Sequence, residues 1–136
     1  AILQSDFVAI CEALVTGKLQ RSQVQFAPLA TVCKYAVPEG YPDQPLKNAI
    51  IDVSGVQNPE QLYFAAVDER AGQLYATGSR AVAVVGVGET LTAAEKIAEA
   101  EIQRIKGKLF HRADIGTEQL LEKRVQHMKE LRQCYV

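Results

Sequence analysis

The sequence predicts an α+β fold, in which a small, bent antiparallel sheet is packed by one main helix and a further helix lies at each end. Three observations lead to this fold class. Short β-prone runs separated by turn residues fill the middle of the chain, from residue 29 to residue 87. Amphipathic segments follow this region and also open the sequence. The chain has 136 residues, 48% of them hydrophobic, which is enough for one compact core.

The first predicted helix covers residues 5–16. Ser5 and Asp6 are common N-cap residue types, apolar residues follow them at helical spacing, and Gly17 comes where helices often end. A last helix is predicted over residues 117–132. Its apolar side is formed by Leu121, Val125, Met128 and Leu131.

Five runs with high β-propensity predict the strands of the sheet. These runs are residues 31–37, 49–53, 62–67, 73–76 and 81–87. Clusters of glycine, proline, serine and asparagine separate them, and spacings typical of hairpins favour antiparallel pairing. The last run is almost entirely apolar, which indicates a strand that is covered on both faces.

The main helix is predicted to begin after Thr90 or Thr92, because Thr92 and Glu95 stand at the spacing of a capping box. An apolar stripe continues as far as Ile105. Residues 106–108 read Lys-Gly-Lys, and basic side chains with a glycine suit a helix C-terminus. We therefore expect the helix to end there.

Charge and cysteine content limit the classes of partner. Fifteen Lys and Arg residues stand against 16 Asp and Glu residues, so neither a nucleic acid nor an anionic membrane is expected as the main partner. Cys11, Cys33 and Cys134 include no CxxC pair, which predicts neither a disulfide framework nor a thiolate metal site. No apolar run approaches the roughly 20 residues that span a bilayer. We expect a cytoplasmic protein.

The chain holds no self-contained catalytic constellation. His111 and His127 have no partner at metal-ligand spacing and are expected to be solvated or half-packed. The run Gly86-Val87-Gly88 lacks the third glycine of a dinucleotide-binding loop, so we interpret its glycines as small residues in a tight strand-to-helix turn. Lys34, in the middle of a predicted strand, is interpreted as a lysine whose ammonium group reaches solvent.

The loop Thr77-Gly78-Ser79-Arg80 is the strongest candidate site. Gly78 and Ser79 could aim backbone N–H groups at one point, and Arg80 adds a planar guanidinium that matches carboxylate or phosphate oxygens. Such a loop would bind an anion, and the alternative is a hairpin turn with an exposed arginine. For Arg112 and Asp114 the corresponding interpretation is a surface ion pair.

Four segments, in order, resemble one known family. They read LQSDFVAICEALVTGKL (3–19), ATVCKYAVPEGYP (30–42), TGSRAVAVVGVGETLTAAEKIAEAEI (77–102) and LFHRADIG (109–116). The last three resemble the C-terminal domain of the phosphoribosylamine-glycine ligases, also called glycinamide ribonucleotide synthetases. The first resembles the helix that follows the ATP-grasp core of these enzymes. The resemblance covers nearly the whole chain, and the helix after Gly116 is its least familiar part.

The resemblance implies a half-barrel-like ATP-grasp C-terminal domain from a ligase of de novo purine biosynthesis. Such enzymes use ATP and magnesium to activate glycine as glycyl phosphate, which phosphoribosylamine attacks to give glycinamide ribonucleotide. The family binds ATP and magnesium mainly upstream of the segments matched here. We therefore expect no cofactor for this chain alone, no activity of its own, and the rest of its polypeptide as its partner.

The same resemblance divides the chain into three parts. Residues 1–25 correspond to the tail of the ATP-grasp core with a connecting helix, residues 26–116 to the ligase C-terminal domain, and residues 117–136 to a C-terminal helix. The sequence begins with Ala1 and not with an initiator methionine, which agrees with a piece of a longer chain. The sequence does not indicate an oligomeric state.

Two matched segments carry family residues onto this chain. The family pattern Thr-Asn-Gly-Gly-Arg falls on Thr77 to Arg80, with one residue missing and Ser79 in place of a glycine. It implies that Gly78, Ser79 and Arg80 face phosphoribosylamine and glycine, and that Arg80 contacts an anion. Arg112 and Asp114 match Arg-Lys-Asp-Ile-Gly, and they either face the substrate or hold the domain in shape.

One departure from the family pattern is substantial. Where bacterial and eukaryotic members of the family have Phe-His-Ala-Gly-Thr, residues 64–68 read Phe-Ala-Ala-Val-Asp, so the histidine and the threonine hydroxyl are missing. Their contacts are lost or supplied by other groups, or the chain belongs to a divergent branch, such as an archaeal one.

Two alternatives remain open. The first is the C-terminal domain of another ATP-grasp enzyme, such as a purine-pathway carboxylase subunit or biotin carboxylase. The runs Gly40-Tyr41-Pro42 and Asp114-Ile115-Gly116 favour the ligase over these enzymes. The second is a stand-alone, non-catalytic α+β module that binds a small metabolite or dimerises, which the lack of catalytic groups would suit.

Overall fold

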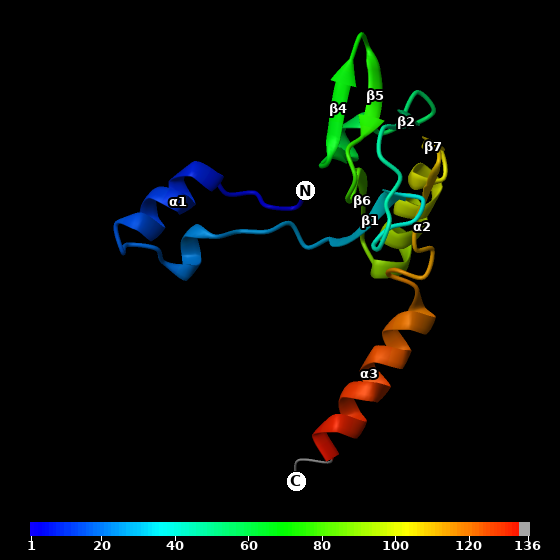
Figure 1. Ribbon diagram of the computed structural model, residues 1–136. Coiled ribbons are helices and arrows are strands. Elements are labelled where there is room, and N and C mark those ends of the chain that lie inside the picture. Colours follow the sequence, from blue (N-terminus) through cyan, green and yellow to red (C-terminus); the bar gives the residue numbers. More distant parts are fainter. Residues whose placement is uncertain (134–136) are drawn as a thin grey trace.

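The computed structural model describes residues 1–133, so Cys134 and the end of the predicted 117–136 segment lie outside the described residues. Two small sheets and one helix form a central body, and a helix extends from it at each end of the chain (Figure 1). The helices are α1 (Phe7–Val15), α2 (Leu91–Ile102) and α3 (Glu118–Gln133). The predicted α+β class is confirmed.

The strands form two four-stranded antiparallel sheets within residues 1–133. The first has the order β3-β6-β1-β8 and the second the order β4-β5-β2-β7. The strands of the first sheet are β1 (Ala30–Pro38), β3 (Leu62–Phe64), β6 (Val82–Gly88) and β8 (Leu109–Phe110). Those of the second are β2 (Ala49–Asp52), β4 (Val67–Arg70), β5 (Gln73–Ala76) and β7 (Lys106–Gly107). Two short 3-10 turns, Arg21–Gln23 and Pro59–Gln61, complete the elements.

The two sheets are joined through a sharp bend. The backbone N–H groups of Ala65 and Ala66 donate to the carbonyl oxygens of Ala81 and Arg80 at 2.9 and 3.0 Å. The N–H of Thr77 donates to the carbonyl oxygen of Ala66 at 3.0 Å. We predicted one bent sheet with a single strand over residues 62–67. The structure has two sheets, because the bend at residues 65–66 interrupts regular pairing: β3 ends at Phe64, and β4 begins at Val67 and continues to Arg70, beyond the predicted strand.

Helix α2 packs closely against β6 and β1. A Cβ atom built on Gly86 would lie 2.0 Å from the carbonyl oxygen of Ala94, and one on Gly88 would lie 2.8 Å from the Ala94 nitrogen. Both glycines lie within β6, so our interpretation of them as turn residues was wrong. Both positions need glycine because the backbone of α2 lies directly against β6 and leaves no room for a side chain.

The core fills the space between the two sheets and continues along α2. Most of its side chains are small or β-branched, as expected for strands covered by a helix. Its fully buried members include Ala36, Ile51, Ala76, Val82, Val84 and Ile102. A second, smaller cluster joins Val32 to Ala94 and Ala98.

The end of α2 differs from the prediction. The helix ends at Ile102, and Lys106–Gly107 form strand β7, which pairs with β2. A Cβ on Gly107, which has φ +142°, would lie 2.3 Å from the carbonyl oxygen of Ile50. A glycine is therefore needed at this position because β7 approaches β2 closely. The basic residues beside it have the sequence pattern of a helix C-terminus, but no helix ends there.

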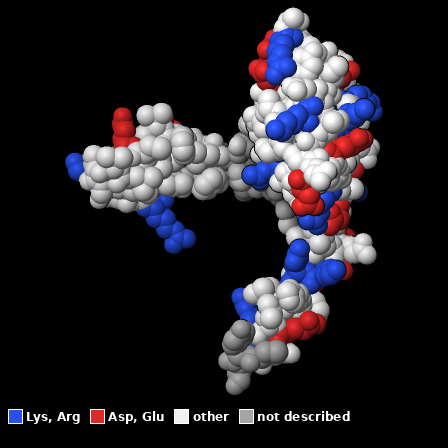
Figure 2. Space-filling view, in the orientation of Figure 1, with Lys and Arg blue, Asp and Glu red and all other residues white. Residues whose placement is uncertain are grey.

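The predicted terminal helices are both present. The Asp6 carboxylate accepts hydrogen bonds from the N–H groups of Val8 and Ala9 at 2.8 and 3.1 Å, which makes it the N-cap of α1. Neither α1 nor α3 contains a buried residue. In residues 1–133 we find no helix with the length and apolar character needed to cross a membrane. Figure 2 shows basic and acidic side chains intermixed over one face of the body.

Candidate functional site

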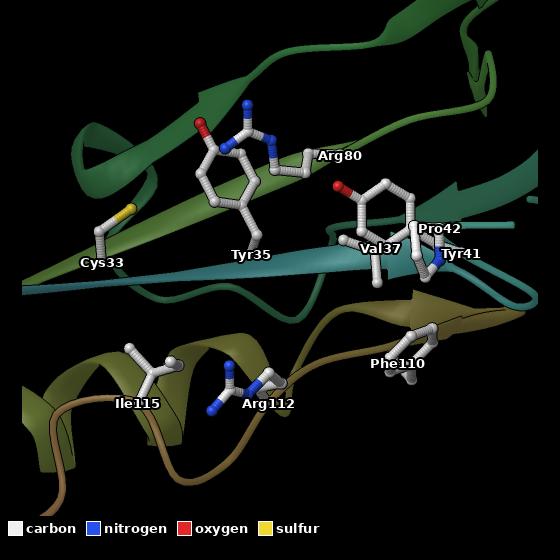
Figure 3. A pocket seen from close by; sticks show the side chains of 9 residues that line it. All are labelled: Cys33, Tyr35, Val37, Tyr41, Pro42, Arg80, Phe110, Arg112 and Ile115. Carbon is white, nitrogen blue, oxygen red and sulfur yellow. The ribbon is translucent and has the colours of Figure 1, made fainter. Parts of the chain in front are cut away.

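A pocket of about 460 Å³ lies beside β1 (Figure 3). Strand β1 contributes Cys33, Tyr35 and Val37, and the turn after it contributes Tyr41 and Pro42. The connection between β5 and β6 supplies Arg80, and the chain from β8 onward supplies Phe110, Arg112 and Ile115. The lining is thus mainly apolar and aromatic, with two guanidinium groups, which suits a small ligand that carries an anionic group.

Alternate side chains of β1 form one wall of the pocket. Successive side chains of a strand point to opposite faces. Val32 and Lys34 are buried toward α2, whereas Cys33 and Tyr35 line the pocket.

Arg80 is the unpaired cation of the pocket. Its guanidinium carbon lies 5.1 Å from the centre of the Tyr35 ring, which is the geometry of a cation–π contact. Among residues 1–133, Arg80 forms no ion pair with a carboxylate. Stacking on Tyr35 therefore orients the guanidinium and leaves its N–H donors available to a ligand.

Arg112 is paired within its own segment. Its Nε and Nη2 donate to the two carboxylate oxygens of Asp114 at 3.0 and 2.6 Å. This hydrogen bonding lowers the pKa of Asp114 and raises that of Arg112. Both residues are exposed, so the expected surface ion pair is present. The structure adds that Arg112 lines the same pocket as Arg80.

Gly78 and Ser79 do not line this pocket. They lie in the connection between β5 and β6, with Gly78 at φ +128°. These two strands belong to different sheets, so the hairpin turn of the alternative was wrong, whereas Arg80 is exposed, as that alternative expected. The role of Gly78 and Ser79 in substrate binding stays a prediction.

Lys34 departs most from the sequence-based expectation. The residue is 1% exposed, so its ammonium group does not reach solvent as we expected. Its Nζ donates to Glu95 at 2.7 Å, to Glu99 at 2.5 Å and to the carbonyl oxygen of Ala113 at 2.8 Å. Burial opposes the charged form, but the hydrogen bonds to the two carboxylates outweigh burial and raise the pKa of Lys34. Glu95 and Glu99 stand four residues apart on the main helix, and this spacing was the pattern in the sequence that could have indicated a site for a buried lysine.

Glu99 connects Lys34 to His111. Burial alone would raise the pKa of Glu99, but hydrogen bonds from Lys34, His111 and Gln103 lower it to about 2. His111 lies with Nε2 3.0 Å from Glu99 Oε1 and is half-buried, so the expectation of a half-packed histidine is confirmed. His127 is exposed on α3, as expected for a solvated histidine.

Cys33 is not an activated thiol. Burial raises the pKa of its thiol, although the charge of Arg80 opposes this effect. A raised pKa leaves less thiolate at neutral pH, and the thiolate is the nucleophilic form.

The described residues do not fit the magnesium ion that the resemblance implies. Magnesium prefers several oxygen ligands. In residues 1–133 no three His, Cys, Asp or Glu side chains are placed to share a metal ion. Asp114, the carboxylate beside the pocket, is already held by Arg112.

Comparison with known proteins identifies the family. Residues 31–118 match the family described as "Phosphoribosylglycinamide synthetase, C domain". Relatives named phosphoribosylamine–glycine ligase are 49% identical over 132 residues in Methanosarcina barkeri and 52% identical over 131 residues in Methanosarcina acetivorans. These alignments cover 97% and 96% of this chain, which spans about 30% of the length of the curated relatives it matches.

A solved structure agrees with these matches. The crystal structure of phosphoribosylamine–glycine ligase from Thermotoga maritima has a TM-score of 0.64 to this chain at 26% sequence identity. The similarity covers 80% of this chain and 27% of that one. The resemblance inferred from four ordered segments is thereby confirmed, and the matched domain covers both sheets and α2. The chain belongs to the phosphoribosylglycinamide synthetase C-domain family.

Proposed function

We propose that this chain is the C-terminal part of an ATP-dependent ligase that joins glycine to 5-phosphoribosylamine. The product is glycinamide ribonucleotide, and the setting is cytoplasmic de novo purine biosynthesis. The supporting observation is the match to relatives of that name at about 50% identity over nearly the whole chain. ATP, with magnesium, would activate glycine as glycyl phosphate, and the rest of the polypeptide would bind both.

The proposed division of the chain follows its architecture. Residues 1–25 would be the tail of the ATP-grasp core, residues 26–116 the C-terminal domain and residues 117–136 a C-terminal helix. The family match begins at residue 31 and ends at residue 118, close to these limits. Helix α1 stands away from the body (Figure 1), and Val15 on it is 89% exposed. The ATP-grasp core of the same polypeptide would cover this helix.

The proposed role of the pocket is to bind an oxyanion of the substrate. Both substrates carry one, since glycine has a carboxylate and phosphoribosylamine has a phosphate. Arg80 would donate two parallel hydrogen bonds to it, because a guanidinium matches carboxylate and phosphate geometry. The aromatic and apolar lining would exclude water and strengthen this charge interaction. Gly78 and Ser79 would set the backbone that carries Arg80.

The activity is tested with the full-length protein and with this chain alone. The full-length protein should form ADP from ATP only when glycine and phosphoribosylamine are both present, and glycinamide ribonucleotide should accumulate in equal amount. Residues 1–136 alone should form neither product. ADP formation that does not depend on either substrate, in the full-length protein, would reject the proposed function.

A further inference from the structure

The buried cluster around Lys34 lies directly behind the pocket. Lys34 is buried on one face of β1, while its neighbours Cys33 and Tyr35 line the pocket on the other. An ammonium group has three N–H donors, and Glu95, Glu99 and the Ala113 carbonyl supply three acceptors within 2.8 Å. The hydrogen-bonding capacity of Lys34 is therefore satisfied inside the protein, and no donor remains for a ligand.

The same cluster holds the chain on both sides of Arg112. Ala113, the residue after Arg112, accepts the hydrogen bond from Lys34 at 2.8 Å. His111, the residue before it, lies with Nε2 3.0 Å from Glu99. Arg112 thus lies between two residues that hydrogen-bond to the Lys34 cluster, and its own side chain lines the pocket (Figure 3). Asp114 then fixes the guanidinium through two hydrogen bonds.

Stability alone gives no sufficient reason for this cluster. Burying an ammonium group and partly burying two carboxylates has a desolvation cost, and well-packed apolar residues often replace buried ion pairs without loss of stability. What an apolar cluster could not do is bond a specific carbonyl oxygen and a specific imidazole. Both of these groups belong to the segment that carries Arg112.

We infer that Lys34 and Glu99 are positioning residues that fix Arg112 at the pocket that Arg80 also lines, so that the pocket offers two guanidinium groups in a set geometry to a substrate that carries an oxyanion. This inference rests on the proposed function. Arg80 supplies the unpaired positive charge, while Arg112, whose charge is shared with Asp114, supplies oriented N–H donors. The ligand group is a carboxylate or a phosphate, and glycine and phosphoribosylamine each carry one of them.

The test compares two glutamates of α2, the partly buried Glu99 and the buried Glu101, in the full-length protein. Glu99→Gln keeps the shape of the side chain but removes the charge that holds Lys34 and His111. Glu101→Gln is the matched control, because Glu101 is 3% exposed and binds Gln57 and Asn58 on another side of the helix. Steady-state kinetics with each substrate varied separately, and amide hydrogen exchange of the peptide 109–117, are the two measurements.

Glu99→Gln should raise KM for the substrate whose oxyanion occupies the pocket by about tenfold or more, with a smaller change in kcat. It should also speed hydrogen exchange in residues 109–117. Glu101→Gln should do neither. Whether KM rises for glycine or for phosphoribosylamine identifies the oxyanion as the carboxylate or the phosphate.

A double-mutant cycle with Arg112→Ala separates positioning from general loss of stability. If Glu99 acts through Arg112, adding Glu99→Gln to Arg112→Ala should raise KM no further. Additive increases in KM, or an unchanged KM in Glu99→Gln, would overturn the inference. If the wild-type full-length protein does not use the two substrates, the proposed function fails, and the exchange comparison decides the inference by itself. Equal exchange in the two glutamine variants would then overturn it.

Discussion

At the scale of single residues, the role of each charged side chain depends on the groups that it pairs or hydrogen-bonds with. Arg80 and Arg112 line one pocket, yet only Arg80 lacks a carboxylate partner in the described part of the chain. Lys34 is buried and fully bonded, so its charge serves the fold of the neighbouring segment. The sequence could identify Arg80 and Arg112 as candidates. It could not place them in one pocket, because the positions of residues 80 and 112 around β1 depend on long-range packing.

The low pKa of Glu99 predicts acid sensitivity. A folded-state pKa of about 2, below the ordinary value of 4.5, stabilises the fold above pH 4.5, and this stabilisation is lost as pH falls toward 2. The shift corresponds to on the order of 3 kcal/mol. Urea unfolding of wild type and Glu99→Gln at several pH values should show a stability difference at pH 7 that shrinks steadily below pH 4.5. A difference that stays constant down to pH 3 would contradict the assigned pairing.

At the scale of elements, close contacts set the glycine positions and the ends of the helices. The predicted strand 73–76 coincides with β5. The ends of the predicted strands 31–37, 49–53 and 81–87 differ by one residue from those of β1, β2 and β6, whereas the predicted strand 62–67 is interrupted by the bend. The edge strands β7 and β8 were missed because each has two residues, too few for an alternating pattern to show. Their pairing depends on distant strands, which local sequence does not encode.

Gly86 should not tolerate a side chain. A methyl group at this position would clash with the Ala94 carbonyl oxygen at 2.0 Å, so Gly86→Ala should destabilise the protein by on the order of 3 kcal/mol. Gly17→Ala is the control, since no atom lies within 4 Å of its added Cβ and only its φ of +66° is unfavourable. That control should cost about 1 kcal/mol. Equal thermal shifts for the two variants would show that α2 does not press against β6.

The N-cap of α2 offers a second test at this scale. Thr90 Oγ1 accepts a hydrogen bond from the Ala93 N–H at 3.1 Å, whereas Thr92 Oγ1 donates to Glu118. Thr90→Ala should therefore cost about 1 kcal/mol of stability, and Thr92→Ala should cost less. Denaturant unfolding of both variants measures the difference. If Thr92→Ala were the more damaging change, the helix would begin at the capping box that we first considered.

At the scale of the whole molecule, the fold class, the terminal helices and the family were predictable, because each depends on patterns spread along the chain. The two-sheet arrangement and the pocket were not, because they depend on long-range packing. The exposed face of α1 is the surface on which we propose that the rest of the polypeptide docks. Phe7 and Val15 on this helix are 66% and 89% exposed, and the chain spans about 30% of its relatives.

The ATP-grasp core should cover α1 in the full-length protein. Val15→Asp should then lower the Tm of the full-length protein by several degrees, because it would bury an unpaired charge. The same change should leave residues 1–136 alone almost unaffected, since Val15 is exposed there. Differential scanning calorimetry of both forms makes the comparison. Equal effects in the two forms would place α1 in solvent in both.

Substrate binding by Arg80 is tested most directly by the kinetics of Arg80→Ala beside Arg70→Ala in the full-length protein. The two arginines make similar stacking contacts, at 5.1 Å from Tyr35 and 5.2 Å from Tyr75, but only Arg80 lines the pocket. Loss of a charged contact to the substrate should lower kcat/KM roughly thirtyfold to a thousandfold in Arg80→Ala. Arg70→Ala should stay close to wild type. Unchanged kcat/KM for both substrates in Arg80→Ala would contradict the account and leave Arg80 with a structural role.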